Sequence, residues 1–105
     1  MEFKAIWSNF AEERIEEIYE YYKTEASIRI AKKVILNLIE ATVVLAYNPN
    51  IGQIEELLVD RDKKYRYLLH KNHKIIYSVD ADNGYVKIAD VFDTRQNPVK
   101  IKRNN

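Results

Sequence analysis

The sequence predicts an α+β fold in which an antiparallel two-helix hairpin packs on one face of a small antiparallel β-meander sheet. Residues 9–47 contain two amphipathic helical patterns separated by only a few residues. Residues 65–92 contain three strand-like runs joined by short turns. A short alternating segment precedes the helices, so the expected order is strand, helical hairpin and meander, which stack as two layers.

The N-terminal strand is expected to lead directly into the first helix. Phe3, Ala5 and Trp7 recur at every second position, which is typical of a strand. Ser8 or Asn9 can then cap the helix by accepting a hydrogen bond from a free backbone N–H. The apolar residues of this helix follow at i, i+3, i+4 and i+7, and they are Ile15, Ile18, Tyr19 and Tyr22.

The second helix is expected to start near Ala26 or Ser27 and to end by Tyr47. Asn48 precedes Pro49, and the residue before a proline avoids helical backbone angles. Its expected buried side consists of Ile28, Ala31, Ile35, Leu38, Ile39, Thr42, Leu45 and Ala46. Because the connection between the helices is so short, they must run antiparallel, and their apolar faces must pack on the sheet.

The strands of the meander follow a loop at residues 48–52. The expected runs are residues 65–70, 74–79 and 85–92, preceded by a short strand and a charged loop within residues 53–64. Strict alternation in the last run places Phe92 on one side with Val86 and Ile88, and Val91 on the other. The helices protect one face of this sheet, so the open face is the candidate working surface. Residues 1–105 are expected to form one domain, with residues 96–105 as a tail or a short turn.

The composition of the 105-residue chain excludes several function classes. The absence of cysteine excludes disulfides, thiolate chemistry and a cysteine-based zinc site. No His or Asp pattern matches a metal-ligand motif, and no glycine-rich phosphate loop is present, so neither a metal nor another cofactor is expected. No leader pattern and no apolar run of about 18 residues occurs, so we expect a cytoplasmic protein that does not contact the membrane.

The chain has a net charge of +1, but its charged residues are unevenly distributed along the sequence. Residues 1–26 carry a net charge of −4, and each later part of the chain is mildly basic. The overall charge alone predicts no affinity for nucleic acid. A near-neutral average can nevertheless hide a positive face away from the acidic N-terminal segment.

The basic stretch within residues 65–74 suggests phosphate chemistry, although a strand with alternating Lys, Arg and His also commonly just faces water. RNA cleavage without a metal needs a base, an acid and a cation that stabilises the phosphorane. Histidines can exchange protons near neutral pH, lysine and arginine can hold the phosphate, and a tyrosine can stack on a base. The candidate catalytic residues are Lys74, Arg95, His73 and Arg66, and the candidate contacts with RNA or another target are Tyr65, Tyr67, His70 and Lys71.

Two phrases of the sequence resemble the RelE/ParE superfamily of bacterial type II toxin–antitoxin toxins, which includes plasmid stabilisation proteins. "HKNHKIIYSVDADNGYVKIADVF", residues 70–92, is similar to the central hairpin of the family, in which a basic residue precedes an aliphatic pair and a tyrosine. "VFDTRQNP", residues 91–98, is similar to the phrase in which an arginine follows the last strand. Lys74 and Arg95 match the two functional basic positions, and the element order matches over nearly the whole chain.

The resemblance implies a toxin that a cognate antitoxin holds inactive. The ribonuclease branch cuts mRNA on the ribosome, often with a Tyr or His near the C-terminus, but residues 96–105 contain neither. The phrase "TRQNP" is nearer to the ParE branch, whose members bind and inhibit DNA gyrase. Three hypotheses therefore remain: a ParE-like toxin that acts by binding, a RelE-like mRNA endoribonuclease, and an attenuated binding scaffold. The oligomeric state is left open, a homo-oligomer included.

Overall fold

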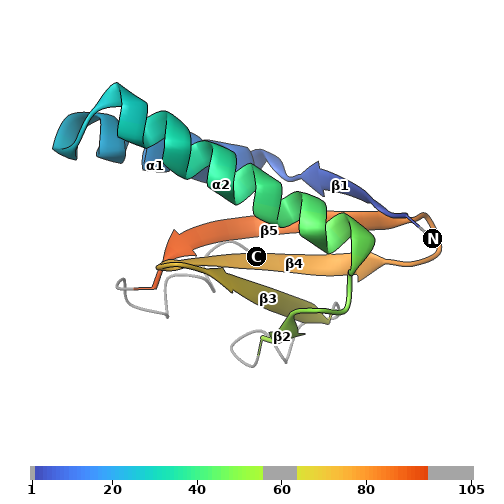
Figure 1. The fold of residues 1–105 in the computed structure, drawn as a ribbon. Coiled ribbons are helices and arrows are strands. Elements are labelled where there is room, and N and C mark those ends of the chain that lie inside the picture. Colours follow the sequence, from blue (N-terminus) through green and yellow to red (C-terminus); the bar gives the residue numbers. More distant parts are fainter. Residues whose placement is uncertain (1, 56–63, 95–105) are drawn as a thin grey trace.

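A computed structural model describes residues 2–55 and 64–94. The elements are β1 (Lys4–Trp7), α1 (Asn9–Glu25), α2 (Ile28–Tyr47), β2 (Gln53–Ile54), β3 (Tyr65–His70), β4 (His73–Asp80) and β5 (Tyr85–Asp93). The two helices lie side by side over one face of the sheet (Figure 1). The predicted α+β architecture is confirmed. The expected tail at residues 96–105 and most of the expected charged loop lie outside the described residues.

The sheet has five strands in the order β1-β5-β4-β3-β2. The meander from β2 to β5 is antiparallel, as predicted, whereas β1 pairs parallel to β5. The sheet is therefore mixed, and the N-terminal strand closes the edge beside β5. This pairing could not be read from alternation, because alternation identifies a strand and says nothing of its partner.

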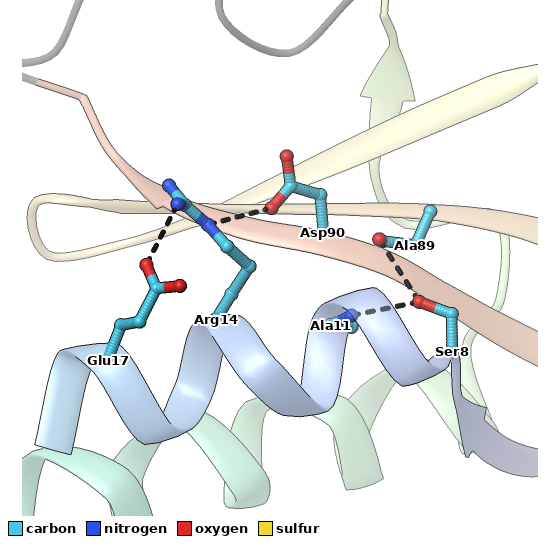
Figure 2. Close-up of polar contacts among 6 residues, drawn as sticks. All are labelled: Ser8, Ala11, Arg14, Glu17, Ala89 and Asp90. Carbon is cyan, nitrogen blue, oxygen red and sulfur yellow. Dashed lines mark hydrogen bonds and ion pairs between the residues drawn. The ribbon is translucent and has the colours of Figure 1, made fainter. Parts of the chain in front are cut away.

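Both helices begin at a serine cap. The hydroxyl of Ser27 accepts a hydrogen bond from the backbone N–H of Ile30 at 3.1 Å. The hydroxyl of Ser8 accepts one from Ala11 at 3.0 Å and also donates to the carbonyl of Ala89 in β5 at 3.2 Å (Figure 2). The cap of α1 therefore also ties the start of this helix to the sheet.

The main core lies between the helices and the covered face of the sheet. Its buried residues are Ala11, Leu38, Ala41, Leu45, Ile75, Tyr77, Val86, Ile88 and Val91. The prediction that Ile28 and Ile39 are buried is wrong, because these side chains are 50% and 42% exposed. Apolar residues occur almost all around α2, so periodicity alone does not define the edge of its buried stripe.

The pairing of β4 with β5 shifts in register between Ile76 and Tyr77. These two strands contribute side chains to two separate apolar clusters. Val91 packs under the helices, while Phe92 packs on the opposite face with Tyr65 and Ile76. The prediction from strict alternation in β5 is therefore wrong at this point. A β-bulge adds one residue to a strand, so the side chains after it point to the opposite face from the one that strict alternation predicts. No local sequence pattern indicated the position of this bulge.

Candidate functional site

The candidate residues lie on both faces of the sheet. Arg66 is opposite the core residue Tyr77 in the ladder between β3 and β4, and His70 is opposite His73, so these side chains belong to the helix-covered face. Lys74 is opposite Phe92 and belongs to the open face, which also carries Tyr65 and Tyr67. Arg95 lies outside the described residues. The alternation predicted for β3 and β4 is confirmed.

Lys74 is enclosed by a carboxylate and two aromatic rings. Its Nζ lies 2.7 Å from Oε2 of Glu55, and the two side chains are only 18% and 3% exposed. The same ammonium lies 4.1 Å from the ring centroid of Tyr67 and 5.9 Å from that of Phe92. Both rings present electron density that favours a cation. The positive charge at this position is therefore neutralised within the protein.

Glu55 is held in place by the sheet. It directly follows the two-residue strand β2, and its backbone N–H donates to the carbonyl of Tyr65 at 2.9 Å. The hydroxyl of Tyr67 donates to Oε1 of Gln53 at 2.9 Å and so ties β2 to the ring that lies against Lys74. Sequence reasoning missed Glu55, because a single acidic residue beside a weak strand pattern carries no distinguishing signal.

Arg66 supports the loop that leads from α2 to β2. Its Nη1 donates to the carbonyl of Gly52 at 2.8 Å. The hydroxyl of Tyr77 accepts from the N–H of Gly52 at 2.9 Å and donates to the carbonyl of Pro49 at 2.8 Å. Burial raises the pKa of Tyr77, while the Gly52 N–H and the charge of Arg66 act in the opposite direction. These contacts give Arg66 a structural role in this loop.

The histidines lie near the turn between β3 and β4. His73 is buried, with its ring centroid 6.2 Å from that of Tyr22 in α1. Nε2 of His70 is buried and has no hydrogen-bond partner among the described residues. Lys71 occupies the turn with φ of 56°, and its side chain is exposed. Lys74 and His73 are neighbours in the sequence, but they point to opposite faces of β4.

A cleft of about 360 Å³ separates the second half of α1 from the end of β5, and Tyr22 and His73 are among its lining residues. Arg14 contributes to its wall and joins the two elements (Figure 2). Nε of Arg14 is 3.6 Å from Oδ1 of Asp90, and its Nη1 is 3.0 Å from Oε1 of Glu17. The arginine thus serves as an electrostatic bridge between helix and sheet, a role that the sequence did not indicate.

Metal binding and membrane insertion receive no support from the described residues. In residues 2–55 and 64–94, no three His, Cys, Asp or Glu side chains cluster as metal ligands would. Neither described helix combines the length and apolar character that a membrane crossing requires.

Solved structures from toxin–antitoxin systems share this arrangement of helices and strands. A chain of the chromosomal ParDE toxin–antitoxin system from P. aeruginosa has a TM-score of 0.72 and 16% identity, covering 89% of this chain and 97% of that one. A chain of the RelBE2 toxin–antitoxin complex from Mycobacterium tuberculosis has a TM-score of 0.63 and 10% identity, covering 89% and 92%. A mutant of the E. coli toxin RelE in the free state has a TM-score of 0.50 and 15% identity, covering 98% of both chains. The chain therefore shares the fold of these three structures.

A match to a family model identifies the family of this chain. Residues 5–98 match the family described as the ParE toxin of the type II toxin–antitoxin system, parDE. No protein with a curated description matches the chain. The match spans most of the chain, so the protein belongs to the ParE toxin family.

Proposed function

We propose that this type II toxin acts in the cytoplasm by binding a cellular target, with DNA gyrase as the expected target, and that it does not cut RNA. The ion pair between Lys74 and Glu55 is the observation that carries this proposal. Membership of the ParE toxin family supports it independently. A cognate antitoxin is the expected inhibitor, in keeping with the ParDE and RelBE2 systems that share the fold.

The contacts of Lys74 argue against phosphate chemistry on the open face. A nuclease needs a cation that is available to the phosphorane and stabilises its charge. Here Glu55 already occupies the position nearest to Nζ, so an incoming phosphate would have to displace this carboxylate or approach it against charge repulsion. Arg66 offers no substitute, because its guanidinium binds the Gly52 carbonyl on the other face.

The positions of the histidines argue in the same direction. General acid and base groups must reach the same phosphate as the stabilising cation. His73 is buried under α1, on the opposite side of β4 from Lys74. A substrate on the open face would therefore meet the lysine without the histidine.

One observation favours the ribonuclease alternative. Tyr65, Tyr67 and Lys74 share the open face, and this combination of aromatic rings and a cation is suited to RNA. Tyr65 is buried, however, and Lys74 would have to leave Glu55 before it could bind phosphate. The ribonuclease alternative therefore requires a rearrangement of this cluster.

Expression in bacteria from a tightly controlled promoter tests the proposal. We expect growth arrest with filamentation and DNA damage, while transcripts stay intact. Fragmentation of mRNA at the onset of arrest would support the ribonuclease instead, and continued growth would support an attenuated scaffold. Arg95→Ala is expected to relieve the arrest, with Arg103→Ala as a control that removes the same charge elsewhere in the chain.

A further inference from the structure

The cleft between the second half of α1 and the end of β5 has the size and lining of a small-ligand site. Its volume of about 360 Å³ lies within the range of roughly 300–1,000 Å³ that is common for ligand pockets. Ile18 of α1 and Val91 of β5 are apolar parts of its lining, and the other described lining residues are charged or aromatic. Pockets of this kind hold the apolar part of a ligand while a few polar groups orient it.

Three aromatic rings follow one another in the lining of this cleft. The rings of Tyr21 and Tyr22 meet edge to face, with centroids 5.2 Å apart and an interplanar angle of 89°. The ring of Tyr22 also lies 6.2 Å from that of His73. Tyr21 is 52% exposed and His73 is only 4% exposed, so this row of rings leads from the surface into the protein. The face of a tyrosine ring carries partial negative charge and therefore attracts a cation.

The charges of α1 favour a cation as well. Glu17 lines the cleft with a side chain that is 65% exposed, and the hydrogen bond from Arg14 goes to its Oε1 at 3.0 Å (Figure 2). Oε2 of Glu17 can therefore accept a hydrogen bond from a ligand in the cleft. The whole of α1 has a net charge of −4, which raises the local concentration of cations on this side of the molecule.

An anion would fit the cleft less well, although Arg14 lies in its wall. Nε of Arg14 is 3.6 Å from Oδ1 of Asp90, whose side chain is only 6% exposed, and Nη1 bonds to Glu17. The guanidinium therefore already shares its charge between two carboxylates. An incoming anion would also approach Glu17 and Asp93, which line the same cleft, and like charges at short distance repel each other.

We infer that the cleft between the second half of α1 and the end of β5 is a binding site for an alkylguanidinium group. A guanidinium is planar, so it can stack on the ring of Tyr21 and direct its N–H donors to Oε2 of Glu17. The alkyl chain would contact Ile18 and Val91. The site lies on the helix-covered side of the sheet and is independent of the proposed toxic function. A free alkylguanidinium and an arginine side chain of another protein share the required chemistry.

Titration of the full chain with three small compounds, followed by NMR, tests the inference. Butylguanidinium is compared with butylurea, which has nearly the same shape without the charge, and with the anion butanoate. We expect butylguanidinium to shift the amide resonances of Tyr22, His73 and Val91 and to bind about tenfold more tightly than butylurea, which lacks the attraction to the rings and to Glu17. Equal binding of these two compounds, tighter binding of butanoate, or shifts confined to other parts of the chain would overturn the inference.

Two matched pairs of variants locate the site. Glu17→Gln can keep the hydrogen bond from Arg14 but loses the charge, so it should weaken butylguanidinium binding about fivefold, whereas Glu13→Gln, on the same helix, should change it little. Tyr21→Leu should weaken binding about tenfold, whereas Tyr47→Leu, on a ring that is 61% exposed at the end of α2, should not. Circular dichroism verifies that all four variants are folded. Equal effects within either pair would overturn the inference.

A short alanine peptide with one central arginine distinguishes the two sources of the group. Its control peptide carries citrulline, a neutral analogue of arginine, at the same position. Tighter binding of the arginine peptide than of butylguanidinium would assign the cleft to an arginine side chain of a partner protein, and weaker binding would assign it to a free small cation. Either result supports the site, whereas equal binding of the arginine and citrulline peptides would overturn it.

Discussion

Lys74 and Glu55 form an almost fully enclosed ion pair on the open face of the sheet, with Nζ 2.7 Å from Oε2. The pair joins β4 to the end of β2, which lies at the edge of the sheet. Tyr67 and Phe92 lie beside the ammonium and limit its contact with water. Lys74, a candidate catalytic residue from the sequence, therefore contributes to the structure of this chain.

The first prediction concerns the stability of this pair. Either Glu55→Leu or Lys74→Met alone should lower the free energy of unfolding by on the order of 2–4 kcal/mol, because one charge then stays enclosed without its partner. The double variant should recover most of this loss, since apolar residues can replace a buried ion pair. Urea denaturation of all four proteins measures the coupling. Additive losses in the double variant would contradict the ion pair.

The second prediction compares two glycines. A Cβ at Gly52 would lie 2.5 Å from the Tyr67 carbonyl oxygen and 2.5 Å from the Tyr77 hydroxyl, so Gly52→Ala should destabilise the fold by about 2–3 kcal/mol. Gly84 has open space around it but a φ of +74°, so Gly84→Ala should cost only about 1 kcal/mol through backbone strain. Thermal and urea unfolding measure both. A smaller loss for Gly52→Ala than for Gly84→Ala would show that the loop can move away from β3.

The third prediction concerns stability at alkaline pH. Burial raises the pKa of Tyr77 above its ordinary value of 10.0, so the folded protein retains this proton at a pH where the unfolded chain has lost it. The contribution of Tyr77 is therefore complete below pH 10.0 and decreases as the pH rises toward the folded pKa. Stability should fall more steeply between pH 9 and 11 in the natural chain than in Tyr77→Phe. Parallel curves for the two proteins would refute the shift.

The fourth prediction separates the two serine caps. Ser27→Ala should cost about 1 kcal/mol, the usual value for loss of a helix cap. Ser8→Ala should cost about 1 kcal/mol more, because the Ser8 hydroxyl also donates to the Ala89 carbonyl. Equilibrium unfolding of both variants provides the comparison. Equal losses would show that the bond from α1 to β5 adds nothing to stability.

Periodicity, capping and turn residues predicted most of the fold. Ser27 and Pro49 mark the limits of α2, and alternation assigned the faces of β3 and β4. The parallel pairing of β1, the bulge near Ile76 and the exposure of Ile39 were missed, because each depends on contacts between distant segments. The candidate site was harder to predict for the same reason. Lys74 stands out in the sequence, but nothing there shows that Glu55 lies against it.

The most direct test of a binding mechanism is a supercoiling assay with purified gyrase, run beside an assay of ribosome-bound mRNA. We expect the natural chain to inhibit supercoiling at concentrations that leave the mRNA uncut. Cleavage of the mRNA together with normal supercoiling would show that the toxin is a ribonuclease and does not act by binding gyrase.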